Sequence, residues 1–122
     1  MKKTAIITGA SRGIGREICR LFAKSGYNVI INYNSSEKEA EKLQKEIGDR
    51  SSMIFKADVS DRDAVFEMCR AAFEKFGSVD VLVNNAGIAA QKLFTDVTEE
   101  EARRMMDVNY FGAFFASQAV IP

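Results

Sequence analysis

Three glycines near the start of the chain are spaced as in a turn that could bind a phosphate group. Gly9, Gly13 and Gly15 follow the apolar run Ala5–Ile7, and apolar residues at helical spacing begin at Ile14. The first turn of a helix has unpaired N–H groups and positive partial charge, and glycine lets an anion approach the backbone closely. The spacing therefore predicts an anion site; the alternative is an ordinary strand-to-helix turn that needs glycine only to redirect the chain.

The pattern of this turn is Gly-x-x-x-Gly-x-Gly. It differs from the Gly-x-Gly-x-x-Gly of the commonest dinucleotide fingerprint, and no Gly-Lys-Ser/Thr sequence of a P-loop follows it. Arg12 lies inside the turn, and its planar guanidinium group suits a phosphate. The alternative for Arg12 is a solvated surface arginine.

Short polar segments also follow three later apolar runs. They are Asn32-Tyr33-Asn34-Ser35, Asp58-Val59 and Asn84-Asn85-Ala86-Gly87. If the apolar runs are parallel strands, the segments meet at the carboxyl edge of the sheet, where such sheets bind ligands. Together with the glycine turn they fit a long ligand lying across the sheet.

The residues needed for histidine-based catalysis or for a zinc site are missing from the sequence. The chain has no histidine, which excludes histidine-based catalysis within this sequence. Cys19 and Cys69 are far apart in helical apolar patterns, so we expect small buried hydrophobic residues and no metal site.

The elements that must position these residues follow from hydrophobic periodicity. The predicted strands are Ala5–Ile7, Tyr27–Tyr33, Ser52–Ala57 and Val79–Val83. The predicted helices are Ile14–Ser25, Ser36–Ile47, Ser60–Phe76 and Thr98–Val120, with a linker over Ile88–Val97. Three residue pairs are expected to cap the later helices: Ser36 with Glu39, Ser60 with Asp63, and Thr98 with Glu101.

The alternation of strands and helices predicts an α/β fold. Strands that are continuously apolar indicate a parallel sheet covered by helices on both faces. Right-handed crossovers then give a Rossmann-like, doubly wound sheet of four strands in order 3-2-1-4. We expect residues 1–122 to form a single dinucleotide-binding domain that is incomplete at its C-terminus.

The end of the second predicted strand bears on the choice of cofactor. NAD-binding proteins place an acidic residue there to bind the ribose 2′-hydroxyl, and a carboxylate would repel a 2′-phosphate. This chain has no acid in that region before Glu37, and Arg12 is nearby in the turn. We therefore predict NADP(H), with NAD(H) as the alternative.

The motifs together resemble the short-chain dehydrogenase/reductase family. Thr8–Gly15 is similar to the family's cofactor turn, and Asn84–Gly87 is similar to its Asn-Asn-Ala-Gly motif, which lines the cofactor. The resemblance implies that Asp58 and Val59 contact the adenine ring. It also implies that Asn109 is the helix asparagine of the catalytic tetrad, which organises a water molecule in a proton relay.

This resemblance also implies a set of cofactor-binding residues and a substrate class. The cofactor-binding residues are Gly9, Ser11, Arg12, Gly13, Ile14, Gly15, Asn32, Tyr33, Asn34, Ser35, Asp58, Val59, Asn85, Ala86 and Gly87. Within the family, Ser11-Arg12 and Ile31-Asn32-Tyr33 are most similar to 3-oxoacyl-acyl-carrier-protein reductases. The implied substrate is a small or acyl-carrier-bound carbonyl compound.

The catalytic tyrosine and lysine of the family have no counterpart in these residues. The family needs a lysine four residues after the tyrosine, because a phenol of pKa near 10 requires a neighbouring positive charge to exchange protons near neutral pH. Tyr27, Tyr33 and Tyr110 are followed at that spacing by Ile, Glu and Phe. We expect an amino-terminal half of an enzyme, inactive alone; the alternatives are a non-catalytic nucleotide-binding fragment or a self-associating half-domain.

Composition limits the partners. Seventeen basic residues balance seventeen acidic ones, and 47% of the 122 residues are hydrophobic, so nucleic-acid and membrane-surface roles are not expected. We expect a cytoplasmic location without a signal peptide. An unpaired edge at the fourth strand and a helix rich in phenylalanine predict a homo-oligomer.

Overall fold

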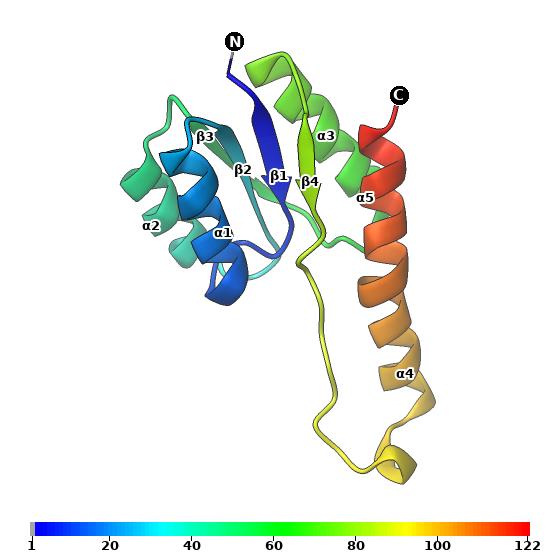
Figure 1. The fold of residues 1–122 in the computed structure, drawn as a ribbon. Helices are drawn as coiled ribbons and strands as arrows, with labels where there is room; N and C mark the ends of the chain where they lie inside the picture. The colour runs from blue at the N-terminus through cyan, green and yellow to red at the C-terminus, as the bar shows by residue number, and fades with distance from the viewer. Residues whose placement is uncertain (1) are drawn as a thin grey trace.

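The computed structural model describes residues 2–122 and contains a four-stranded parallel sheet in the order β3-β2-β1-β4 (Figure 1). The strands are β1 (Thr4–Ile7), β2 (Asn28–Tyr33), β3 (Ser52–Lys56) and β4 (Val81–Val83). Ile6 of β1 lies in register with Ile30 on one side and Leu82 on the other. The predicted fold class and strand order are therefore confirmed.

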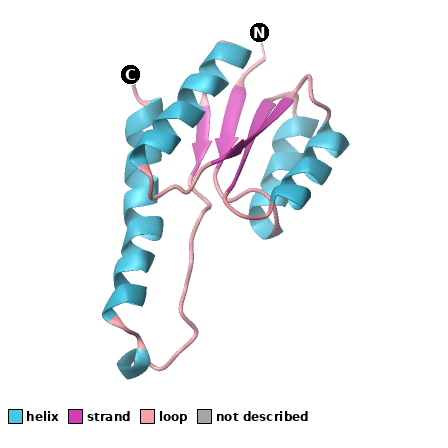
Figure 2. Ribbon diagram, turned by 180° about the vertical axis from the view of Figure 1, so that it is seen from behind, coloured by secondary structure: helices cyan, strands magenta, loops and turns pink. Residues whose placement is uncertain are grey.

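Helices cover both faces of this sheet (Figures 1 and 2). On one face, α1 (Gly13–Lys24) and α2 (Glu37–Ile47) pack against side chains such as Ile7 and Ile31. On the other face, α3 (Arg62–Phe76) and α5 (Gly112–Val120) pack against Ile6 and Ile30. Successive residues of a strand point to opposite faces, and every residue of β1 and β2 is buried.

Both cysteines are buried in these two cores, as predicted. Cys19 is on the buried face of α1 and Cys69 on the buried face of α3, and neither is in a disulfide. Burial raises the pKa of Cys19 to about 12 and that of Cys69 to about 11. Both thiols are therefore protonated, apolar packing groups at neutral pH.

One of the three predicted capping pairs is confirmed. Thr98 and Glu101 form a complete capping box at the start of α4 (Glu99–Met106). The predicted box of Ser36 with Glu39 is wrong, because the Ser36 side chain makes no capping hydrogen bond and Glu39 instead pairs with Arg16 at 2.5 Å. That ion pair joins α2 to α1.

The predicted cap of α3 by Ser60 and Asp63 is also wrong. Ser60 donates its hydroxyl to Asp58 at 2.7 Å, so it is not available to the helix. The helix begins two residues later, and Asp61 accepts a hydrogen bond from Ala64 N at 3.2 Å as its N-cap.

The predicted fourth helix contains a change of winding. The π-helical segment η2 (Asp107–Phe111) lies between α4 and α5, and the predicted linker contains a 3-10 turn, η1 (Phe94–Asp96). Single π turns inside helices are often found at functional sites. The linker runs away from the sheet edge before α4 returns toward it (Figure 1).

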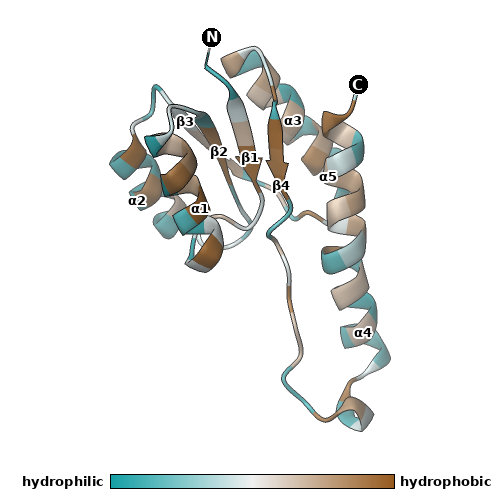
Figure 3. Cartoon of the chain, viewed as in Figure 1, coloured by the Kyte–Doolittle hydropathy of each residue, from teal (hydrophilic) through white to brown (hydrophobic). Residues whose placement is uncertain are grey.

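The strands are predominantly apolar, whereas the helices alternate apolar and polar residues (Figure 3). Several large apolar side chains beside the π turn remain open to solvent, including Tyr110 at 55% and Phe114 at 50% exposure. Within residues 2–122, no helix has the length and apolar character needed to cross a membrane.

Candidate functional site

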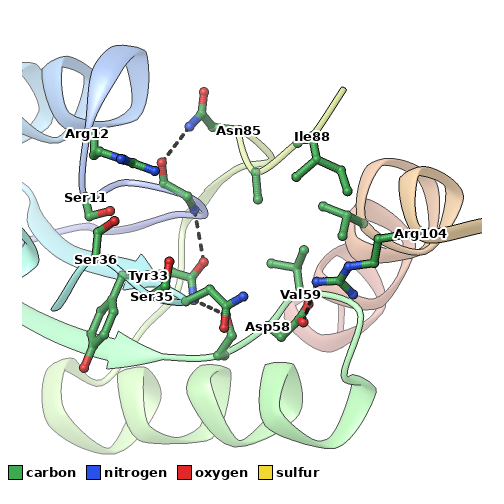
Figure 4. A pocket seen from close by; sticks show the side chains of 17 residues that line it. Ser11, Arg12, Tyr33, Ser35, Ser36, Asp58, Val59, Asn85, Ile88 and Arg104 are labelled. Atoms are coloured by element: carbon green, nitrogen blue, oxygen red, sulfur yellow. Dashed lines mark hydrogen bonds and ion pairs between the residues drawn. The ribbon is translucent and has the colours of Figure 1, made fainter. Parts of the chain in front are cut away.

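A cavity of about 340 Å³ lies at the carboxyl ends of the strands (Figure 4). Its walls come from the end of β2, from the segments that follow all four strands, and from α4 and η2. The structure thus brings together most of the predicted site residues. Those in the wall are Gly9, Ser11, Arg12, Asn32, Tyr33, Asn34, Ser35, Asp58, Val59, Asn85, Ala86 and Gly87.

Four predicted residues do not line this cavity. Gly13, Ile14 and Gly15 form the first turn of α1, in which Gly13 and Ile14 are exposed and Gly15 is buried. Asn109 lies in the π turn. Five wall residues were not among the predicted cofactor-binding residues: Ser36, Ala57, Ile88, Arg104 and Val108. Arg104 and Val108 lie in the predicted fourth helix, Thr98–Val120, whose position relative to the sheet could not be predicted.

The glycine turn presents a row of unpaired amides. Within the described chain, none of the backbone N–H groups of residues 11–15 donates a hydrogen bond to another residue. Arg12, the N-cap of α1, gives no side-chain cap, and the first turn has no acidic residue. These amides and the positive end of the helix are arranged for an anion.

The three glycines of the turn serve different purposes. A Cβ at Gly15 would lie 2.5 Å from Asn85 Nδ2, and a Cβ at Gly9 would lie 2.8 Å from Ala86 Cα. Both therefore allow close packing of the segments that follow β1 and β4. Gly13 has a φ of +61° and no atom within 4 Å of its Cβ position, so the space beside it is open.

Asn32 organises the turn from beneath. Its Oδ1 accepts a hydrogen bond from Gly9 N at 3.0 Å, and its Nδ2 donates to Ala57 O at 3.1 Å. The side chain is 2% exposed. Asn32 therefore ties the end of β1 to the end of β3, in addition to lining the cavity.

A second link joins the turn to the segment after β4. Thr8 Oγ1 accepts hydrogen bonds from the amides of Asn85 and Ala86, each at 3.0 Å. In return, Asn85 Nδ2 donates to Gly9 O at 2.9 Å. This reciprocal arrangement fixes both loops, and Thr8, which was not among the predicted site residues, is at its centre.

Arg16 and Glu39 form an ion pair near the end of β2. Arg16 donates to Ser11 O at 3.0 Å and to Glu39 at 2.5 Å, and this hydrogen bond lowers the pKa of Glu39. Burial, together with the nearby Glu37 carboxylate, raises the pKa of Tyr33. Arg12 makes no ion pair within the described residues, so its charge is open to a ligand.

Asp58 is the one carboxylate in the wall. Its Oδ1 accepts from Ser60 and its Oδ2 accepts from Arg104 Nη2 at 2.7 Å. Burial alone would raise the pKa of Asp58, but the hydrogen bonds from Ser60 and Arg104 outweigh burial and hold it below its usual range. The group is therefore a charged acceptor at neutral pH.

Asn109 contacts Ile88, one of the residues in the cavity wall. Its side-chain amide makes two hydrogen bonds to the backbone of Ile88, each 2.8 Å long. The π turn is thereby joined to the segment that leaves β4. The residue supports the rim; the predicted role in a proton relay stays a prediction.

Comparison with known proteins gives a consistent result. A family model described as short chain dehydrogenase matches residues 3–122. The chain is 44% identical over 124 residues to 3-oxoacyl-(acyl-carrier-protein) reductase FabG of Staphylococcus epidermidis, covering 100% of this chain and 51% of that protein. It is 38% identical over 118 residues to a hydroxynaphthalene reductase-like protein of Metarhizium guizhouense, covering 95% of this chain and 44% of that protein. The chain thus spans about half the length of these relatives.

Solved structures match the fold closely. The 3-ketoacyl-(acyl-carrier-protein) reductase of Brucella melitensis, solved with NADH, has a TM-score of 0.93 at 39% identity, over 98% of this chain and 49% of that chain. A short-chain dehydrogenase/reductase of the same organism, described as a glucose/ribitol dehydrogenase, has a TM-score of 0.91 at 30% identity, over 98% of this chain and 51% of that chain.

Proposed function

The chain belongs to the short-chain dehydrogenase/reductase family, and from this premise we propose that its cavity binds a nicotinamide dinucleotide. The observation that carries the proposal is the row of unpaired amides over residues 11–15 beside the open space at Gly13. A diphosphate carries negative charge and many acceptor oxygens, which is what such a helix terminus binds. The residues present therefore fit the cofactor.

The remaining wall residues suit the other parts of such a molecule. Asp58 and Val59 offer an acceptor and an apolar contact for the adenine ring. Arg12, Asn34 and Ser35 surround the end of β2, where the adenosine ribose of a dinucleotide binds in doubly wound folds. The segment Asn85–Gly87 would border the nicotinamide half.

We propose NADP(H) as the preferred form. Among the described residues that line the cavity at the end of β2 there is no carboxylate to repel a 2′-phosphate, and the Glu39 carboxylate, which interacts electrostatically with Arg12, is already paired with Arg16. NAD(H) is the competing choice, since a relative at 39% identity was solved with NADH.

We propose that a full-length protein containing these residues reduces a 3-oxoacyl thioester or similar carbonyl compound. When bound, the reduced nicotinamide supplies a hydride. This chain contributes the glycine turn for the diphosphate, and Asp58 and Val59 for the base. It also contributes Asn109, for which we propose a role in positioning a water molecule. The 122 residues contain no Tyr-x-x-x-Lys, so we propose that they bind cofactor without turnover.

Titration of the 122-residue chain with NADPH and NADH tests this proposal. We expect saturable binding of both with NADPH bound more tightly, and no NADPH oxidation in the presence of an acetoacetyl thioester. Equal or tighter NADH binding would contradict the cofactor preference. Turnover would contradict the assignment of the missing acid–base pair, and absence of binding would contradict the whole proposal.

Self-association is proposed as a second property. In the described residues β4 has a strand neighbour on one side only, so its other edge has unpaired backbone groups. Tyr110 of η2 and Phe114 of α5 add exposed apolar area. A cytoplasmic location stays a prediction.

A further inference from the structure

We propose that Arg104 is a positioning residue for base recognition in this cavity. It holds the Asp58 carboxylate so that one acceptor site faces the ligand, and this arrangement favours adenine over hypoxanthine. The inference rests on the proposed function, since it concerns the base of the proposed dinucleotide. No motif of the sequence indicated this residue, which lies 46 positions after its partner.

The first observation is a closed ring of hydrogen bonds. Arg104 Nη2 donates to Asp58 Oδ2 at 2.7 Å, and Arg104 Nη1 donates to Ser60 Oγ at 2.8 Å. Ser60 donates its hydroxyl to Asp58 Oδ1 at 2.7 Å and its backbone N–H to the same atom at 3.0 Å. Figure 4 shows Arg104 extending from α4 to Asp58 at the wall of the cavity. The ring fixes the direction of the carboxylate plane.

The second observation is the number of acceptor sites still free on Asp58. A carboxylate has about four lone-pair sites. Two on Oδ1 accept from Ser60 and one on Oδ2 accepts from Arg104, which leaves one on Oδ2. Since Asp58 and Arg104 both line the cavity, this site is available to a ligand donor.

The free site distinguishes two purines by their chemistry. Adenine carries an exocyclic amino group, which donates hydrogen bonds, whereas hypoxanthine carries a carbonyl oxygen at the same position, which only accepts. A charged acceptor pairs with the first group and repels the second. The hydrogen bonds that keep the pKa of Asp58 low maintain this charge.

The third observation is that packing holds η2 and the start of α5, which continue directly from α4, against the loop after β3. Val108, one turn after Arg104, lines the cavity and packs in the cluster that contains Val59. A Cβ at Gly112 would lie 2.5 Å from Val59 Cγ2, so only glycine permits this approach of α5 to the loop after β3. Arg104 lies one turn before this packed segment on the same continuous helix, within reach of Asp58.

The experiment compares NADH with reduced nicotinamide hypoxanthine dinucleotide, in which a carbonyl oxygen replaces the purine amino group and the adjacent N1 carries a hydrogen. The chain has no tryptophan, so nicotinamide fluorescence reports binding directly. The variant is Arg104→Met, and the matched control is Arg103→Met. Arg103 is the neighbouring residue of α4, and its side chain bonds only to Glu99, at 2.9 Å, within the described chain.

The native chain should bind NADH about tenfold more tightly than the hypoxanthine analogue, the size of effect expected for one charge-assisted hydrogen bond. Arg104→Met should reduce this ratio to about twofold or less, and Arg103→Met should leave it unchanged. Arg104→Lys, which keeps the charge but not the planar fork, should give an intermediate ratio. It also serves as the test if Arg104→Met does not fold by circular dichroism.

Three results would overturn the inference. They are a native chain that binds both dinucleotides equally, an Arg104→Met variant that keeps the native ratio, and Asp58→Asn and Arg104→Met effects on the ratio that simply add in the double variant. Each of them leaves the proposed function intact, because NADH still binds. A native chain that binds neither dinucleotide would overturn both.

Discussion

Asn109 holds the backbone of Ile88 at two points, although the residues are 21 positions apart. Its Oδ1 accepts from Ile88 N and its Nδ2 donates to Ile88 O, each at 2.8 Å. Only a side-chain amide offers a donor and an acceptor in this arrangement. Asn109 therefore fixes the segment that leaves β4 against the π turn.

Replacement of Asn109 by aspartate should loosen this segment. The new side chain would keep an acceptor for Ile88 N but would place a carboxylate oxygen against Ile88 O. We expect a loss of roughly 1–2 kcal/mol of unfolding free energy, the usual cost of a lost and an opposed hydrogen bond. Hydrogen exchange of the Ile88 amide, measured by NMR, should become faster in Asn109→Asp.

The control for that experiment is Asn84→Asp. Asn84 also lies in the segment that follows β4, but within residues 2–122 its exposed side chain bonds only to the Ser117 hydroxyl, at 3.3 Å. Exchange at Ile88 should stay slow in this variant. Equal exchange rates in the native chain and in Asn109→Asp would contradict the two-point contact.

The preference for a 2′-phosphate should depend on Arg12. Its side chain is exposed at the cavity wall without an ion-pair partner in the described residues. Arg12→Met should weaken NADPH binding by about tenfold and NADH binding by much less, since only NADPH has the extra phosphate. Arg50→Met, at an exposed site after α2, should change neither dissociation constant. A parallel loss for both cofactors in Arg12→Met would show that Arg12 does not read the phosphate.

Sequence patterns predicted the sheet and the rim of the site for identifiable reasons. The strands β1 and β2 are buried throughout, so their apolar runs are continuous and easily recognised. Parallel strands bring their carboxyl ends to one edge of the sheet. Residues predicted at strand ends, such as Asn32 and Asp58, therefore line the same cavity.

The contacts made by the predicted fourth helix, Thr98–Val120, could not be predicted in the same way. Residues 88–98 have no hydrophobic period, and they fold as an extended segment with a single 3-10 turn. Without the path of this segment, the sequence does not indicate that Arg104 meets Asp58 or that Asn109 meets Ile88. The wrong cap at Ser36 has a related cause, because Glu39 is paired with Arg16 of another helix.

The Asp58 carboxylate should make the free energy of unfolding fall at acid pH. Its pKa is held below the usual range in the folded chain, so the unfolded chain binds the proton more readily. The stabilisation is therefore complete above the unfolded pKa of about 3.9 and is lost as the pH falls below it. Urea unfolding of the native chain and of Asp58→Asn should show a free-energy difference that is constant above about pH 5 and shrinks below about pH 4. A difference that does not change with pH would contradict the assigned shift.

Self-association should depend on the exposed face of α5. Phe114 is 50% exposed, and Phe114→Asp should shift the molar mass from light scattering toward that of a monomer. Leu21→Asp is the matched control, since Leu21 is 64% exposed on α1, which covers the opposite face of the sheet. A native chain that remains monomeric at all concentrations would exclude this property.

The glycine turn offers a pair of substitutions that separate backbone strain from ligand space. Gly13 and Gly26 both have positive φ, at +61° and +88°, and neither has an atom within 4 Å of its Cβ position. Alanine at either site should therefore cost a similar amount of stability, about 1 kcal/mol. Gly13 lies at the proposed diphosphate site, whereas Gly26 follows the far end of α1.

The most direct test is an NMR titration of the native chain, Gly13→Ala and Gly26→Ala with NADPH. In the native chain and in Gly26→Ala, the amide signals of residues 11–15 should shift and saturate, together with that of Asp58. In Gly13→Ala, affinity should fall at least about tenfold, because the added methyl group occupies the space of the phosphate. Amides of residues 11–15 that do not respond to saturating NADPH, or equal affinities in all three proteins, would contradict the proposed dinucleotide site.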